Sequence, residues 1–174
     1  MGELMKLKKQ IRMAMLSAIA LAIFWVEAQI PVPVPVPGVK LGLANVVTVY
    51  AVFALGTWEA AGILLIRVLL GSLFSGQIVS LLYSAAGGAL AFLTVLGLRR
   101  ILTEKQIWVA SCLSAVAHNL GQIAVAIAIT QTPALLYYLP VLLVSGLITG
   151  LFTGLAAQAL VLHFKKIKKH STRT

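Results

Sequence analysis

Six polar side chains stand out in a chain that is otherwise dominated by apolar residues. Two are cations that attract anionic groups, one is an imidazole, and three are carboxamides that both donate and accept hydrogen bonds. They are Lys40, Asn45, Arg67, His118, Asn119 and Gln122. Polar side chains in the hydrocarbon region of a membrane are costly unless they are paired or line a cavity. The set therefore predicts a binding site for an anionic or strongly polar small molecule.

Spacing groups three of these residues on one helix. His118 and Gln122 are four residues apart, and Asn119 and Gln122 are three apart, so the three side chains share a helix face. Counting about 1.5 Å per residue from the predicted helix ends places them in the middle or outer half of the bilayer, together with Asn45 and Arg67. The expected ligand site therefore lies toward the outer surface.

The same residues allow a purely structural interpretation. Glu27 is the one acid within the predicted spans at the height of Arg67, and a buried ion pair between the two would satisfy both charges. His118 and Asn119 would then hold helices together through hydrogen bonds. The sequence alone leaves this alternative open beside the ligand site.

Catalysis is not expected from this residue inventory. The chain contains no aspartate, and its acids are four glutamates, whereas magnesium–diphosphate chemistry relies on clustered carboxylates. It also lacks the GxxxxGK[ST] phosphate loop. His118 is a poor metal site by itself, and Cys112, the single cysteine, is expected to pack within a helix. We therefore expect no enzymatic activity, no catalytic residues, no metal and no cofactor.

Composition indicates that these residues lie in an integral membrane protein. The chain has 174 residues, of which 60% are hydrophobic and 10% charged, and its mean hydropathy is +1.01. These values are typical of a polytopic membrane protein. We expect a single all-α domain over residues 1–174 with six transmembrane helices. The predicted spans are residues 11–30, 41–55, 58–74, 77–98, 107–129 and 134–164. The last is long enough to hold a tilted helix or a kink at Pro140.

The positive charges predict the orientation of this bundle. Lysines and arginines number 4 in the N-terminal segment up to Arg12, 3 after the fourth span and 5 in the C-terminal tail, and the other side carries Lys40 alone. By the positive-inside rule, both termini are cytoplasmic in a bacterial cytoplasmic membrane. Because the charges are confined to short segments, they suit anionic membrane lipid and not nucleic acid.

Alternating prolines mark the segment between the first two spans. Four prolines from Pro31 to Pro37 favour a stiff, extended, polyproline-like strap, and the following Gly38 favours a turn back toward the membrane. A strap of this kind over residues 30–40 has the shape of a lid above an outward-facing site. A rigid connector without a lid function is the alternative.

Small residues recur at helical spacing in two of the predicted spans. Ala14, Ala18 and Ala22 leave a groove on the first helix that suits close approach of another helix, either within the chain or in a partner protein. A GxxxGxxxG stripe from Gly146 to Gly154 on the last helix favours packing inside the bundle.

Three sequence blocks carry a resemblance to a known family. They are PVPVPVPGVKLGLANVVTVYAVFALG, RVLLGSLFSG and AVAHNLGQ, and with them essentially the whole chain resembles the Gx transporter family, often labelled heptaprenyl diphosphate synthase component I. That family in turn is similar to the substrate-binding S components of energy-coupling-factor (ECF) transporters. The resemblance implies an S-component-like six-helix bundle in which the loop after the first helix is the lid. It also implies that the six polar residues lie near the ligand.

The resemblance further implies partners. Ala14, Ala18 and Ala22 match the AxxxA motif of S components, which contacts a transmembrane coupling subunit energised by two ATPases. The expected function is therefore substrate binding for an ECF-type importer of a small vitamin-like or cofactor-like molecule, with a flavin- or quinone-related compound as a candidate. The alternative is an accessory membrane protein of heptaprenyl diphosphate or menaquinone biosynthesis.

Overall fold

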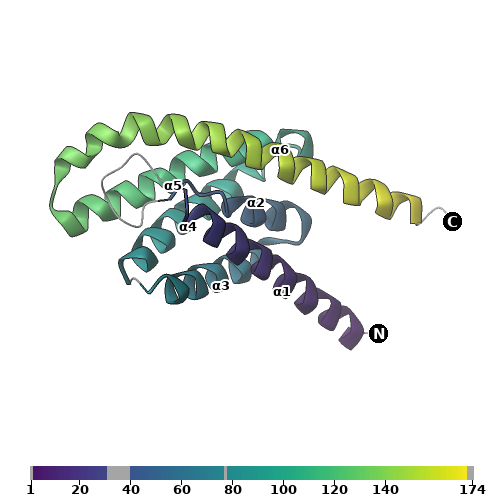
Figure 1. Cartoon of the computed structure of the whole chain (residues 1–174). Coiled ribbons are helices and arrows are strands. Elements are labelled where there is room, and N and C mark those ends of the chain that lie inside the picture. The colour runs from purple at the N-terminus through teal and green to yellow at the C-terminus, as the bar shows by residue number, and fades with distance from the viewer. Residues whose placement is uncertain (1, 31–39, 77, 172–174) are drawn as a thin grey trace.

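The protein is an all-α bundle. The computed structural model describes residues 2–30, 40–76 and 78–171, and every regular element in these ranges is helical (Figure 1). The helices are α1 (Gly2–Glu27), α2 (Asn45–Ala54), α3 (Thr57–Ser75), α4 (Ile78–Leu98), α5 (Ile107–Thr130) and α6 (Leu139–Ser171), with short 3₁₀ turns η1 (Glu104–Gln106) and η2 (Pro133–Tyr138).

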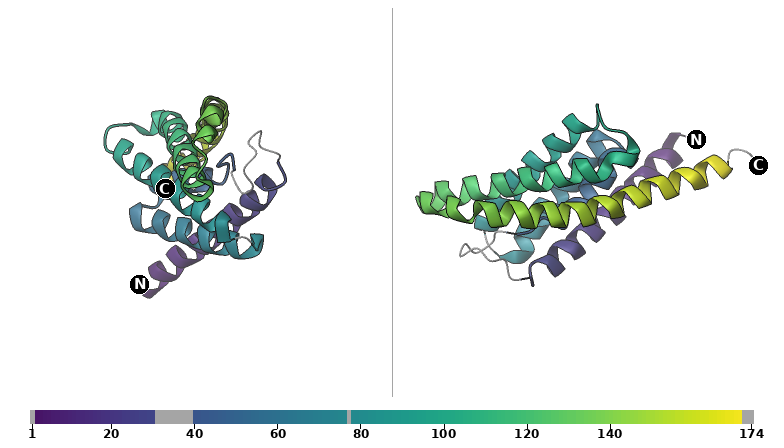
Figure 2. Two further views of the ribbon diagram at one scale, coloured as in Figure 1. Left: turned by 90° about the vertical axis from the view of Figure 1, so that its left-hand side faces the viewer. Right: turned by 90° about the horizontal axis from the view of Figure 1, so that it is seen from above.

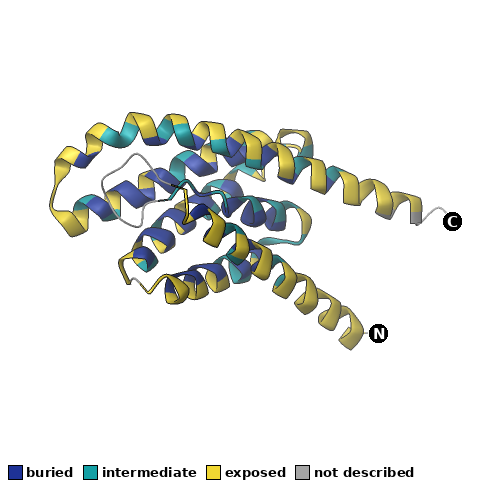
Figure 3. Cartoon of the chain, in the orientation of Figure 1, coloured by how far each residue is buried: buried dark blue, intermediate teal, exposed yellow. Residues whose placement is uncertain are grey.

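Five of the helices are long and apolar enough to cross a membrane, and α2 is a shorter apolar helix. Large hydrophobic side chains such as Leu69, Leu93 and Phe152 are exposed on the outside of the bundle, as Figure 3 shows along its length. In water such a surface would be unfavourable, whereas in lipid it is the expected exterior. The chain is therefore a multi-pass membrane protein, as the composition predicted.

The short helix α2 occupies the middle of the bundle. It contacts all five long helices, and its side chains Val49, Ala51 and Val52 are fully buried. Ten residues span about 15 Å, which is about half of a bilayer's hydrocarbon core. Residues 40–44 lead into α2, and we call them the stem. The stem and α2 together form the central column of the bundle, and the stem occupies the half that α2 does not reach.

Glycines set the packing of α5 against α6. A Cβ on Gly150 would lie 2.7 Å from Cα of Cys112, and one on Gly154 would lie 2.6 Å from Cα of Trp108. Only glycine allows backbones to approach this closely, and such contacts are a main source of helix association in lipid. The predicted role of the GxxxGxxxG stripe in internal packing is confirmed. Cys112 lies in the same seam, with its thiol 3.7 Å from the carbonyl of Leu147.

The first and last helices bring the chain ends together. α1 begins and α6 ends at the same end of the bundle (Figures 1 and 2). Two interhelical ion pairs lie at this end, one between Lys9 and Glu59 and the other between Lys165 and Glu104. An even number of crossings explains this arrangement, and the polar pairs mark the end where the helices leave the hydrocarbon.

Some predicted boundaries differ from the structure. α1 starts at residue 2 instead of 11, and α6 continues to residue 171 instead of 164. Of the two alternatives for the last span, a tilted helix or a kink at Pro140, the kink is wrong. Pro140 is the second residue of α6, where a proline replaces an N–H that has no intrahelical partner. The proline strap and its Pro-Gly turn fall on residues 31–39, outside the described residues, and stay a prediction.

Candidate functional site

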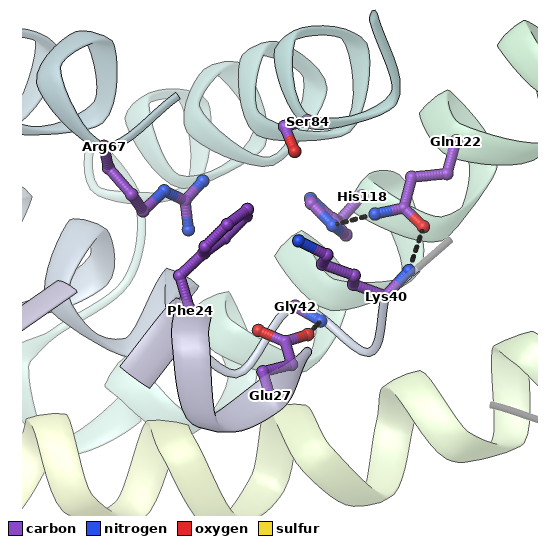
Figure 4. Close-up of a pocket in the computed structure, with 8 residues that line it drawn as sticks. All are labelled: Phe24, Glu27, Lys40, Gly42, Arg67, Ser84, His118 and Gln122. Carbon is purple, nitrogen blue, oxygen red and sulfur yellow. Dashed lines mark hydrogen bonds between the residues drawn. The ribbon is translucent and has the colours of Figure 1, made fainter. Parts of the chain in front are cut away.

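A small cavity lies above the N-terminus of α2, beside the end of α1 and so in the half of the bundle away from the chain ends. Side chains from α1, α3, α4 and α5 line it, and the stem closes it (Figure 4). The lining residues are Phe24, Glu27, Lys40, Gly42, Arg67, Ser84, His118 and Gln122. Four of the six side chains predicted from the sequence are among them.

Arg67 is a buried cation to which no carboxylate of the described residues is bound. Its side chain is 3% exposed, and its Nη1 donates a 3.0 Å hydrogen bond to Oδ1 of Asn45, the first residue of α2. Gly88 of α4 makes room for the guanidinium, because a Cβ there would lie 3.3 Å from Nη2. Asn45 thus positions Arg67 from beneath and does not itself line the cavity.

Glu27 binds backbone groups of the stem. One carboxylate oxygen accepts the N–H of Gly42, and the other accepts the N–H of Ala44 at 3.3 Å. These groups precede α2, where helix N–H groups lack intrahelical partners and an anion is favoured. Glu27 and Arg67, both described, do not form the direct ion pair of the structural interpretation. Glu27 instead holds the stem against the end of α1.

Lys40 contributes a second cation from the stem. Its backbone N–H donates a 2.9 Å hydrogen bond to Oε1 of Gln122, and its Nζ lies 3.3 Å from the centroid of the Phe24 ring. A cation over an aromatic face is attracted by the ring's quadrupole. Burial is the main cause that lowers the pKa of Lys40 from 10.5 to about 8, and Arg67 lowers it further while Glu27 raises it.

His118 and Gln122 form a hydrogen-bonded pair on α5. Nε2 of His118 lies 2.6 Å from Nε2 of Gln122, and both side chains are buried. Because the Gln122 oxygen already accepts the N–H of Lys40, its amide nitrogen must donate to His118. Nε2 of His118 is therefore the acceptor, and the ring is a neutral imidazole with its proton on Nδ1. The stem thus fixes the tautomer of a buried histidine.

Gly42 allows the stem to approach this pair. Its φ is +83°, a left-handed conformation that side chains disfavour. A Cβ at this position would lie 2.9 Å from Nδ2 of Asn45 and 3.0 Å from Cδ2 of His118. A larger residue would have to push the stem away from the cavity.

Asn119 is the predicted site residue that the structure places elsewhere. Its Nδ2 donates a 2.6 Å hydrogen bond to the carbonyl of Leu142 on α6, so the side chain joins α5 to α6 and does not line the cavity. Successive helical residues point about 100° apart, and for this reason Asn119 faces away from His118 although the two are adjacent.

Three lining residues were missed by the sequence reasoning. Phe24 is one of many apolar residues of the first span, and Ser84 is one of several small residues of the fourth. Neither carries a signal that separates it from packing residues. Gly42 lies within the VKLGLAN block. A lone glycine just before a helix indicates a left-handed turn, and this signal could have identified Gly42 from the sequence.

The alanine groove lies on the face of α1 that points away from the cavity. Ala14, Ala18 and Ala22 are exposed on the side of α1 that faces away from the bundle, whereas Ala20 and Phe24 face inward. The groove is thus open on the outside of the described bundle, among exposed side chains such as Met15 and Trp25. No group of three or more histidine, cysteine or glutamate side chains suited to a metal occurs in the part of the chain that the structure describes.

Residues 16–160 match the family model described as heptaprenyl diphosphate synthase component I. The chain belongs to this family. The match covers all of the cavity's lining residues and two of the three groove alanines, so the site lies within the part of the chain common to the component I family. No curated protein and no solved structure matches the chain.

Proposed function

We propose that this component I family member is a membrane-embedded substrate-binding subunit of an ECF-type importer, similar to the S components of such transporters. Its substrate would be a small vitamin-like or cofactor-like molecule. The observation that carries the proposal is the polar cavity above α2, which two cations line, Lys40 and Arg67, and among the described residues no carboxylate forms an ion pair with either. Buried cations of this kind in a membrane protein mark a ligand path by default.

The cavity chemistry favours binding over catalysis. Ser84 is the lining hydroxyl and His118 the lining imidazole, yet Nε2 of His118 already accepts the Gln122 amide and cannot also remove a proton from a nucleophile. The charged groups therefore serve recognition in this proposal, and the chain is not an enzyme.

The size of the cavity gives the stem a gating role in this proposal. The enclosed space amounts to about 10 Å³, roughly what one water molecule needs and far below the range of about 300–1,000 Å³ that is usual for small-molecule pockets. A substrate therefore enters only when the stem moves. Glu27 and Gln122 hold the stem by hydrogen bonds to Gly42, Ala44 and Lys40. Breaking these bonds opens the site to the outer side, and re-forming them encloses the substrate.

The exposed alanine groove is the proposed docking surface. Ala14, Ala18 and Ala22 offer a shallow apolar face that the bundle itself does not cover, and a transmembrane helix of the coupling subunit would pack closely there. ATP hydrolysis by the two associated ATPases would then drive the whole subunit to topple and release its substrate inward.

Co-purification with a tagged coupling module tests the proposal. Ala18→Leu fills the groove and is expected to lower recovery of the complex at least tenfold, while the small molecule retained by the protein, read by native mass spectrometry, is unchanged. Ala89→Leu adds the same bulk at an exposed position of α4 and is expected to leave assembly intact. Equal recovery of the two variants would refute the docking surface.

The family name supports a second candidate, an accessory membrane protein of heptaprenyl diphosphate or menaquinone synthesis. In that case the chain would hold a prenyl synthase or a prenyl chain at the membrane. It predicts that a polyprenyl compound co-purifies with the protein and that Arg67→Gln changes its retention little. A water-soluble ligand at one per chain, lost in Arg67→Gln, would exclude it.

A further inference from the structure

The charges around the cavity do not cancel. Arg67 and Lys40 each contribute one positive charge, and Glu27 contributes one negative charge, because both of its oxygens accept N–H groups, as expected for an ionised carboxylate. His118 is neutral by the tautomer that Gln122 imposes. The described lining therefore carries a net charge of about +1 while Lys40 is protonated.

Neither cation is neutralised by direct contact. Glu27 is committed to Gly42 and Ala44, and the one hydrogen bond that Arg67 makes among the described residues goes to the neutral Asn45. Lys40 faces the Phe24 ring. An uncompensated buried charge is strongly unfavourable, whereas a counter-charge inside the site removes most of that penalty.

The unused donors converge on one place. A guanidinium has further N–H groups beyond the one that binds Asn45. Figure 4 shows the Arg67 guanidinium and the Lys40 ammonium approaching the space beside Phe24 from two sides, with Ser84 at its edge. An oxyanion placed there receives charge-assisted hydrogen bonds from both cations, which are the strong kind.

We infer that the cavity recognises a singly charged oxyanion, a carboxylate or a phosphodiester, held between Arg67 and Lys40. This inference rests on the proposed substrate-binding function and adds the charge of the group that is bound. A dianion would leave the site one negative charge in excess, and a cation would raise the positive excess. A soluble compound and a lipid headgroup share the required chemistry.

Thermal unfolding of the full chain in dodecyl maltoside, near neutral pH, tests the charge rule. Acetate and dimethyl phosphate are the monoanion probes, sulfate the dianion and tetramethylammonium the cation, all at one ionic strength set with sodium chloride. We expect the monoanions to raise Tm by about 2–4 °C at concentrations well above Kd. A larger rise with sulfate or with tetramethylammonium would overturn the inference, and so would the absence of any rise both with these probes and with phosphatidylglycerol.

Two variants change the charge count in opposite directions. Arg67→Gln lowers the net charge to about zero and is expected to abolish the response to monoanions. Glu27→Gln raises it to about +2 and is expected to shift the preference to sulfate. Arg100→Gln removes an exposed cation at the other end of the bundle and should behave as wild type. Should a variant fail to fold, the ranking of probes on the wild-type protein still decides.

Mixed micelles separate the two sources of the anion. A rise in Tm with phosphatidylglycerol that depends on Arg67, without one from acetate or dimethyl phosphate, assigns the group to a lipid headgroup. The reverse assigns it to a soluble ligand. A co-purified neutral ligand would overturn the charge inference and leave the proposed function standing. Failure of Ala18→Leu to affect docking would instead refute the proposed docking and leave the charge inference standing.

Discussion

The backbone N–H of Lys40 donates a 2.9 Å hydrogen bond to the side chain of Gln122, and this bond joins the stem to α5 across 82 residues of sequence. The same amide group orients His118 through its nitrogen. One glutamine therefore couples closure of the stem to the arrangement of the cavity wall.

Gln122→Ala should release the stem. It leaves the Lys40 N–H without an acceptor, and we expect a loss of about 1–3 kcal/mol in the free energy of unfolding, with faster amide hydrogen exchange in residues 40–44. Asn119→Ala is the matched control, because it removes a buried hydrogen bond from the same helix to Leu142. It should destabilise the protein comparably without accelerating exchange in the stem. Equal exchange in both variants would contradict the coupling.

Gly42→Ala should push the stem out of the cavity. The new Cβ meets Asn45 and His118 at about 3 Å, and the positive φ adds a strain of about 1–2 kcal/mol. Gly76→Ala carries the same backbone penalty at φ +65° with nothing within 4 Å of the Cβ. Native mass spectrometry should show loss of the retained small molecule in Gly42→Ala alone. Retention in both variants would show that the close approach of the stem is dispensable.

Binding of a monoanion should weaken as pH rises through the lowered Lys40 pKa of about 8. Above that value the ammonium becomes neutral and the site loses one positive charge. Isothermal titration with dimethyl phosphate one pH unit below and one above this pKa should show the loss. Lys40→Arg keeps the charge and should remove the pH dependence.

The free energy of unfolding of the ligand-free chain should rise with pH above about 8, whereas binding of the monoanion weakens. Because the pKa of Lys40 is about 8 in the folded protein and 10.5 as its ordinary value, the unfolded chain binds more protons between these values. The contribution of Lys40 to the free energy of unfolding therefore rises with pH over this window. Denaturation without ligand should show a rise in wild type that is absent in Lys40→Arg.

The seam between α5 and α6 should be intolerant of bulk. Gly150→Leu drives a side chain into the Cα of Cys112, which is backbone and cannot move aside cheaply, and we expect a loss of at least about 1–3 kcal/mol. Gly97→Leu, at an α4 glycine whose Cβ would meet nothing within 4 Å, is the control. Similar resistance of both variants to unfolding by sodium dodecyl sulfate would argue against tight packing at this seam.

The orientation of the bundle remains a prediction with a direct test. In a Cys112→Ser background, Thr132→Cys lies after α5 and Arg100→Cys after α4, both at exposed positions. A membrane-impermeant maleimide added to intact bacterial cells should label the cysteine at position 132 and not the one at 100. Labelling at 100 alone would invert the predicted orientation and place the cavity toward the cytoplasm.

The sequence predicted the helices better than the directions of side chains. Long apolar runs and clustered charges suffice to place membrane spans, because the bilayer imposes their length. The start of α1 was missed because its first turns are polar. Lysines such as Lys6 and Lys8 are good helix formers, but a polar segment is not recognised as part of a membrane span.

Only some of the residues that line the cavity could be predicted from the sequence. Cations in an apolar run are conspicuous, and Lys40 and Arg67 were found for that reason. Whether Asn119 faces the cavity or α6 depends on the rotation of α5 against its neighbours, which residue spacing does not fix. Glu27 was identified as a partner for Arg67, yet it binds the backbone of the stem, because backbone N–H groups leave no trace in a side-chain pattern.

The shortness of α2 has a consequence for how such a protein can diversify. Half of its central column is helix, and the remainder is a loop stem with a handful of side chains around it. A substitution at a half-buried stem position such as Lys40 alters what the site accepts without disturbing the helix contacts that keep the bundle folded. One scaffold can therefore acquire a new specificity by few mutational steps, each tolerable on its own, while the outer face of α1 stays unchanged.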